Sequence, residues 1–151
     1  MAEMNIRRAE KEDVYRLSEI IIWNYRMKFY PIFRDDEFYF KELQVKSMGD
    51  SYLCPEKLEN TFVYDDGILK GVIVLEGDEV KKLFVDPYFQ NGKIGTELLQ
   101  FAVRERGVSH LWALEKNTDA IRFYARHGFL PDGRKKYEED TVEYLVHLTK
   151  Q

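Results

Sequence analysis

The chain has 151 residues, 44% hydrophobic and 33% charged, so it has the size of one domain and is too apolar to be disordered. With 23 Lys and Arg against 27 Asp and Glu, its formal charge of −4 argues against general nucleic-acid binding, which requires a basic surface. A single cysteine, Cys54, excludes an internal disulfide and a cysteine-based zinc site, and the longest apolar run is four residues, so we expect a cytoplasmic protein without a membrane span or signal peptide.

The N-terminal part predicts a short strand at Ile6 and two helices. Asp13 is expected to cap the first helix, because Asp is a favoured N-cap residue. The apolar residues that follow it at helical spacing are Val14, Leu17 and Ile21. A second helix is expected to begin near residues 35–37, whose acids suit the positive end of a helix dipole. Residues 47–60 lose this pattern and are predicted to form a loop.

The central part predicts three consecutive strands. Residues 62–64 and 68–75 are rich in β-forming side chains and flank Asp65-Asp66-Gly67, a tight-turn signal. A second turn at Gly77-Asp78 leads into a strand over residues 80–85. Pro87 ends that strand because proline cannot donate a ladder hydrogen bond.

Helices and strands alternate in the C-terminal part. A helix near Thr96 ends at Gly107, residues 110–114 form a strand, and a helix over residues 120–127 ends at Gly128. The alternating residues of the last strand are Val142, Tyr144, Val146 and Leu148. Residues 134–140, a charged run, are expected to be a solvated loop. The order β-α-α-β-β-β-α-β-α-β predicts one domain, residues 1–151, with a mixed sheet, because the helix near Thr96 joins two strands as a parallel crossover.

The turn before the helix near Thr96 is the segment that carries chemistry. The first N–H groups of a helix lack internal partners and carry partial positive charge, and glycines there let a phosphate approach the backbone. Gly92, Gly95 and the cation of Lys93 therefore predict a pyrophosphate cradle, although an ordinary turn that contains glycine fits the spacing equally well. The glycine spacings of a P-loop and of a dinucleotide-binding fingerprint are both missing.

Val85-Asp86-Pro87, followed by Gln90 and by Gly95 at a helix start, resembles the acyl-CoA-binding motif of the GNAT superfamily of N-acetyltransferases. The family pattern is [QR]-x-x-G-x-[GA]. Gln90 occupies its first position and Gly95 its last, whereas Lys93 stands at the middle glycine, with Gly92 just before it.

A second, independent match lies downstream. The residues that match the family segment N-x-x-A-x-x-F-Y-x-x-x-G-F are Asn117, Ala120, Phe123, Tyr124, Gly128 and Phe129. The opening Ile6-Arg7-x-Ala9-x-x-x-Asp13 also resembles that of the family. Because the two motifs stand in the expected order within the expected elements, the resemblance is specific.

The resemblance implies an α+β fold with a mixed, mostly antiparallel twisted sheet, helices on both faces and a splayed central pair of parallel strands. It also implies acetyl-CoA as co-substrate, with the pantetheine arm between the splayed strands like an added strand. The cofactor-binding residues that it implies are Leu83, Phe84, Val85, Gln90, Asn91, Gly92, Lys93, Ile94, Gly95, Thr96, Asn117 and Tyr124. The amides of residues 91–96 would hold the pyrophosphate.

The implied reaction is direct attack of a primary amine on the acetyl thioester. The amine must first lose a proton, because a lysine-like amine has a pKa of about 10.4. A backbone N–H near Val85 is the candidate donor to the carbonyl oxygen as it becomes negative. By the resemblance, Tyr124 gives the leaving sulfur its proton; by the helix pattern alone it would be a core aromatic. Some family members carry a glutamate where this chain has Trp112, so Glu79 or a water chain is the candidate base, unless Glu79 is simply a solvated turn residue.

The sequence says less about the acceptor and the partners than about the cofactor. Residues 23–40 hold eight aromatic side chains, which together with the acids of residues 35–37 predict either a pocket for an ammonium group or core and dimer contacts. Three histidines, His110, His127 and His147, lack metal-ligand spacing, so no metal is expected. Alternating apolar residues near the C-terminus leave room for a strand-mediated homodimer.

The function that we expect is an acetyl-CoA-dependent N-acetyltransferase acting on a primary amine of a small molecule or peptide. One alternative is a non-catalytic acyl-CoA-binding or sensing domain, which Lys93 and Trp112 favour slightly. Asn117 and Tyr124 favour the enzyme, because a mere binder has less need of an acid beside the sulfur. A nucleotide-binding regulatory module would leave residues 117–129 unexplained.

Overall fold

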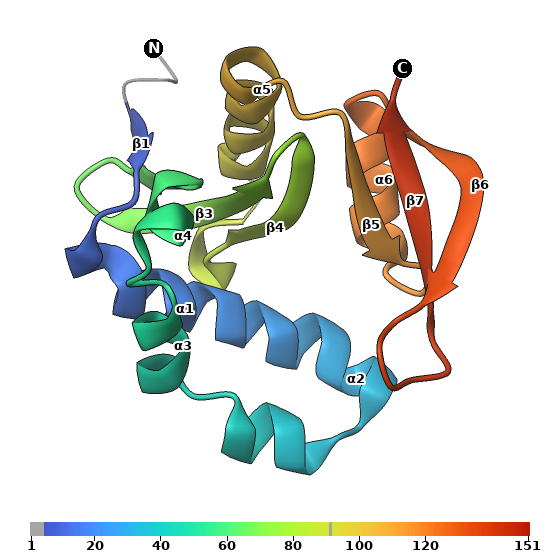
Figure 1. Ribbon diagram of the computed structural model, residues 1–151, viewed down its shortest axis with the longest axis horizontal. Helices are drawn as coiled ribbons and strands as arrows, with labels where there is room; N and C mark the ends of the chain where they lie inside the picture. Colours follow the sequence, from blue (N-terminus) through green and yellow to red (C-terminus); the bar gives the residue numbers. More distant parts are fainter. Residues whose placement is uncertain (1–4, 91) are drawn as a thin grey trace.

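The computed structural model describes residues 5–90 and 92–151, and its strands form one sheet in the order β1-β2-β3-β4-β5-β7-β6 (Figure 1). The strands are β1 (Ile6–Arg8), β2 (Thr61–Asp65), β3 (Leu69–Glu76), β4 (Glu79–Val85), β5 (His110–Leu114), β6 (Phe129–Tyr137) and β7 (Tyr144–Lys150). All neighbours are antiparallel except β4 and β5, which are parallel. The mixed, mostly antiparallel sheet predicted from the sequence is confirmed.

Helices cover both faces of the sheet. One face carries α5 (Ile94–Arg106) and α6 (Thr118–Arg126), while α1 (Val14–Asn24) and α3 (Val45–Ser51) cover the other. The short segments are α2 (Tyr30–Phe33), α4 (Pro55–Glu59), the 3₁₀ turns Lys11–Asp13 and Pro87–Phe89, and the π-helical turns Tyr25–Phe29 and Phe38–Glu42. Within the described residues, no helix is long and apolar enough to cross a membrane.

Alternation along β3 divides the core in two. Ile73 packs with Leu98 and Phe129 on the α5 and α6 face, whereas Val72 packs with Leu17 and others on the α1 face. All five side chains are fully buried. The sheet therefore holds two hydrophobic layers, each made from one face of its strands.

The boundaries of α5 and α6 agree with the predicted stop signals. Gly107 and Gly128 follow the two helices with φ angles of +65° and +86°, a conformation that glycine adopts without a steric cost. The second helix predicted near residues 35–37 begins there, with Asp35 accepting a hydrogen bond from the Phe38 N–H, but it continues as a π-helical turn.

Two segments differ from the prediction. Residues 47–60 form α3 and α4 rather than a loop, and residues 129–137 form β6, so the sheet has seven strands rather than six. The solvated loop predicted over residues 134–140 is therefore wrong in its first half. An edge strand has a sheet neighbour on one side only, so its sequence need not alternate; of β6 only Phe129 is buried.

Two predictions, one near each end of the chain, are also affected by the structure. Asp13 does not cap α1; its carboxylate accepts from the Glu10 N–H at 2.8 Å and from Arg7 at 2.7 Å, which closes a turn before the helix. The alternating strand near the C-terminus, β7, lies between β5 and β6 and offers no free edge. The homodimer predicted from that strand stays a prediction.

Candidate active site

The parallel strands β4 and β5 form a wedge. They pair only at Glu79 with His110 and at Val80 with Leu111, next to the turn that begins β4. Beyond these pairs the strands separate, and their distant ends lie well apart above α1 and α2 (Figure 1). The splayed pair expected from the family resemblance is present.

Backbone groups of β4 face into this wedge. Gly71 of β3 and Val85 of β4 face each other, and the Asp86 N–H donates to the Lys70 carbonyl at 2.8 Å. In an antiparallel ladder this pattern makes Gly71 and Val85 a non-hydrogen-bonded pair. The N–H and C=O of Val85, and those of Leu83 two residues earlier, therefore point toward β5 and away from β3. Phe84 has the opposite orientation, so its backbone pairs with β3 instead of facing the wedge.

A cavity of about 630 Å³ occupies the wedge. Of the residues predicted to bind the cofactor, its lining includes Leu83, Phe84, Asn117 and Tyr124. Of the others, Val85 ends β4, Asn91 lies outside the described residues, and the rest lie along the β4–α5 turn and the first turn of α5. The cavity thus lies between β4, which leads into the first motif, and the second motif at the start of α6.

The turn between β4 and α5 is tied to α1. Asp86 is 6% exposed; one of its carboxylate oxygens accepts from Arg16 at 2.8 Å and the other from the Tyr88 N–H at 2.9 Å. Thr96 at the start of α5 lies 3.1 Å from His127 Nε2, which links α5 to the end of α6. These contacts fix the first turn of α5 beside the open end of the wedge.

The middle glycine of the family pattern is replaced at a conformation that favours glycine. Lys93 precedes α5 with φ of +68°, in the left-handed region. Gly92 is outside that region, and a Cβ on it would meet only the Phe89 carbonyl oxygen at an ordinary 3.5 Å. The lysine therefore holds, at a steric cost, a backbone conformation that glycine adopts freely.

Tyr124 and Asn117 reach the cavity from α6. Tyr124 is 8% exposed, and within the described residues no group bonds its hydroxyl. Burial raises the pKa of Tyr124 above its usual value, so the phenol keeps its proton at neutral pH. Asn117 caps α6 by accepting from the Ala120 N–H at 3.3 Å.

Glu79 stands apart from these groups. It begins β4 at the closed end of the wedge, 3.6 Å from Lys81, and it does not line the cavity. The structure therefore does not bring the predicted base together with Tyr124.

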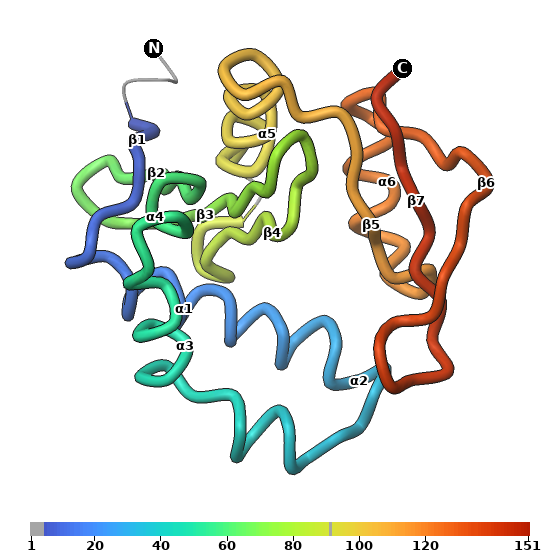
Figure 2. Tube along the Cα trace, viewed as in Figure 1, coloured from blue at the N-terminus to red at the C-terminus, as the bar shows by residue number. Residues whose placement is uncertain are grey.

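Sequence reasoning missed three lysines, Lys28, Lys81 and Lys82, and a loop that line the cavity. Lys28 and Lys82 reach it from the π-helical turn after α1 and from β4. Burial lowers the pKa of both, to about 8 for Lys82. Residues 138–141, which join β6 to β7, close the far side beside α2, as the trace in Figure 2 shows. The sequence has no local pattern that places Lys82 on the cavity, because its position depends on a bulge between β3 and β4, and the loop carries no motif.

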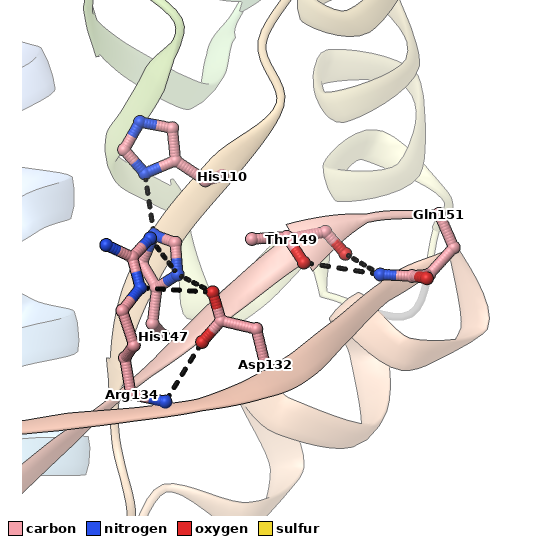
Figure 3. A network of polar contacts seen from close by, with 6 residues as sticks. All are labelled: His110, Asp132, Arg134, His147, Thr149 and Gln151. Atoms are coloured by element: carbon pink, nitrogen blue, oxygen red, sulfur yellow. Dashed lines mark hydrogen bonds and ion pairs between the residues drawn. The ribbon is translucent and has the colours of Figure 1, made fainter.

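A polar network sits on β5, β6 and β7 next to the closed end of the wedge (Figure 3). His147, 2% exposed, lies 2.6 Å from Asp132 and 2.9 Å from His110. His110 in turn lies 3.2 Å from Asp78, at the turn that starts β4. Arg134 also contacts His147, at 2.9 Å. The network joins the edge strand β6 to the residue pair that closes the wedge.

Comparisons with known proteins agree with this geometry. Residues 57–131 match the family model of the acetyltransferase (GNAT) domain. The chain is 29% identical over 134 residues to an uncharacterised N-acetyltransferase of Methanocaldococcus jannaschii, covering 82% of this chain but only 59% of that protein. It is 26% identical over 136 residues to the peptidyl-lysine N-acetyltransferase YjaB of Salmonella typhimurium, covering 90% of each.

Solved structures share the fold. The apo form of YjaB from Escherichia coli has a TM-score of 0.69 at 22% identity, over 95% of each chain. The PaiA N-acetyltransferase from Thermoplasma acidophilum, in complex with coenzyme A, has a TM-score of 0.65 at 21% identity, over 95% of this chain and 97% of that one. Family model, relatives, fold and wedge all point the same way: the chain belongs to the GNAT superfamily of N-acetyltransferases, whose acetyl donor is acetyl-CoA.

Proposed function

We propose that this protein transfers the acetyl group of acetyl-CoA to a primary amine of a peptide or small molecule by direct attack. The observation that carries the proposal is the wedge itself. The two strands pair at only two positions, and the cavity beyond them is lined by Leu83, Asn117 and Tyr124.

The residues present fit the pantetheine arm of CoA. Leu83 and Val85 offer backbone groups that β5 does not pair, as an added strand would require. The Val85 carbonyl already accepts from Asn24 and Gln90, so the Val85 N–H and both groups of Leu83 are the ones left for a ligand. At the open end, the first amides of α5 and the cation of Lys93 suit a pyrophosphate.

Each chemical task has a candidate group. A backbone N–H of Leu83 or Val85 would donate to the carbonyl oxygen as negative charge develops on it. Tyr124 would give its proton to the leaving sulfur, since its hydroxyl has no other partner in the described part of the chain. With Glu79 outside the cavity, a water chain is the proposed route by which the acceptor loses its proton.

The acceptor that we propose is cationic. Asp35, Glu138, Glu139 and Asp140 lie together on the lining of the cavity, where they would attract an ammonium group. Phe33, Phe38 and Tyr39 line the same side and would hold its carbon chain. Asp36 and Glu37 of the predicted acidic group do not line the cavity. YjaB of Salmonella typhimurium, a relative, is a peptidyl-lysine N-acetyltransferase, which supports a lysine side chain as the first acceptor to try.

Two measurements test the proposal. CoA should raise the melting temperature by mass action, and more than ATP or NAD does. With acetyl-CoA and a panel of lysine peptides, polyamines and amino sugars, thiol release should depend on the amine. Cys54 is an exposed free thiol, so a Cys54→Ser variant keeps the thiol count clean. Binding of CoA without turnover on any amine would favour the acyl-CoA-binding alternative instead.

A further inference from the structure

Lys82 is a lysine that the proposed reaction leaves without a role. It lies on β4 directly before Leu83 and lines the same cavity as Tyr124. Its Nζ donates to the Tyr52 hydroxyl at 3.1 Å and stands 5.8 Å from the centre of the Tyr25 ring. Among the described residues, no carboxylate pairs with it.

The surroundings of Lys82 favour a neutral amine. Burial and, to a smaller extent, the neighbouring charges of Lys57 and Lys81 together lower its pKa to about 8. Near neutral pH about one Lys82 in ten is then uncharged, roughly two hundred times the fraction for an ordinary lysine with a pKa of about 10.4. The one hydrogen-bond partner of Nζ in the described residues is the Tyr52 hydroxyl, and once the amine is neutral and turns away from this contact its lone pair can attack a carbonyl carbon.

We propose that Lys82 is an acetylation site of the enzyme itself, modified once by acetyl-CoA held in the cavity of the same chain. This inference rests on the proposed function. A bond forms between Nζ and the acetyl carbon, and the bond from that carbon to sulfur breaks. The sulfur leaves with the electron pair and takes up the proton that the nitrogen loses, so the products are acetyl-lysine and CoA thiol. No oxidant or further reactant is needed.

Two other lysines on the cavity lining are less suited to this reaction. Lys81 is exposed, and its Nζ forms an ion pair with Glu79 at 3.6 Å. The pKa of Lys28 is also lowered by burial, but the charge of Asp119 opposes that shift, and its Nζ stands over the Phe84 ring at 6.0 Å. Only Lys82 combines cationic neighbours with a place directly beside the backbone of Leu83.

The test is mass spectrometry of the full chain after incubation with deuterated acetyl-CoA and no amine. The isotope separates new acetyl groups from any acquired during expression, each adding about 42 Da plus the deuterium. We expect one label per chain, mapped to Lys82, formed at a rate that tenfold dilution of the protein leaves unchanged. Excess CoA should block the reaction. The rate should rise with pH and level off near pH 8 instead of climbing to pH 10.

Two variants form a matched pair. Lys82→Arg keeps the positive charge and should remove the label, whereas Lys81→Arg should leave the labelling rate within about twofold, because it changes a neighbour on the same strand in the same way. Labelling that CoA does not block, that acetyl phosphate reproduces, or that falls on Lys28 would overturn the inference. So would the absence of a label. If CoA still raises the melting temperature and amines still turn over, that absence leaves the proposed function standing; if neither happens, both fail.

Discussion

The side chains of Asn24 and Gln90 meet at the last carbonyl of β4. Gln90 Nε2 lies 3.3 Å from Asn24 Oδ1, and the two residues donate to the Val85 carbonyl at 3.1 Å and 3.0 Å. Gln90, the first residue of the family motif, thus hydrogen-bonds the last carbonyl of β4 within the protein. Asn24 joins α1 to the same carbonyl, at the end of β4. A direct contact of Gln90 with CoA stays a prediction.

Replacing Asn24 should loosen this junction. Asn24 is fully buried and also donates to the Ile20 carbonyl at 2.8 Å, so Asn24→Leu leaves both carbonyls and the Gln90 amide short of a partner. We expect a loss of roughly 1–3 kcal/mol in the free energy of unfolding, measured by urea denaturation. Gln100→Leu, an exposed substitution on α5, is the control and should change stability by less than about 0.5 kcal/mol. Equal effects of the two variants would contradict this role.

Lys93→Gly should stabilise the protein. At φ of +68° the lysine side chain is strained, and glycine removes that strain while adding freedom to the unfolded chain. A gain on the order of 0.5–1 kcal/mol is expected, seen as a higher melting temperature. Gly92→Ala, one residue earlier, should be neutral or slightly stabilising, because its Cβ meets only an ordinary contact. A loss of stability in Lys93→Gly would show that contacts of the lysine side chain stabilise the fold by more than the backbone strain destabilises it.

Thr96→Glu should separate folding from cofactor binding. A carboxylate in the first turn of α5 interacts favourably with the helix dipole, so the fold should hold. The same charge would repel a pyrophosphate at the amides of that turn, and the dissociation constant of CoA should rise by about tenfold or more. Calorimetric titration measures it, with Gln100→Glu as a control of equal charge further along α5. Unchanged affinity would place the phosphates elsewhere.

Tyr124→Phe should affect the chemical step rather than binding. It removes one hydroxyl that has no partner in the described residues, so packing is nearly unchanged. We expect kcat to fall by about a hundredfold, within the usual range for loss of a general acid, while the affinity for CoA changes little. Steady-state kinetics beside CoA titration make the comparison. If both constants fell together, the hydroxyl would serve to hold CoA.

The parts of the fold that the sequence predicts are those in which local periodicity and burial agree. Residues 110–114 form a short apolar run after Gly107, and β5 has the predicted bounds. By contrast, α3 depends on a long-range fit: a Cβ on Gly49 would lie 2.3 Å from the Tyr15 ring, so this glycine lets α3 approach α1. A glycine inside a helix lowers local helix propensity, which is why this segment looked like a loop.

The candidate site shows the same division. Motif spacing places Asn117 and Tyr124 on one helix, and the structure puts both on the cavity lining. Lys82 lines the cavity because of a bulge between β3 and β4, where Val74 pairs with Lys82 and Leu75 pairs with Val80. That irregularity changes which side chains face α1, and no local pattern announces it.

Asp132 provides a prediction for acid pH. The Arg134 N–H and the His147 ring lower its pKa to about 2, against about 3.9 for an unfolded aspartate. A carboxyl with a lowered pKa in the folded state stabilises the protein above the unfolded value, and this contribution disappears as pH falls from about 4 to about 2. Asp132→Asn cannot ionise, so it should be less stable than the parent at pH 7 and should lose less stability on acidification. Urea denaturation at several pH values tests this, with Glu56→Gln, an exposed change on α4, expected to follow the parent. Identical pH profiles for parent and Asp132→Asn would mean that the contact with His147 contributes nothing to stability in solution.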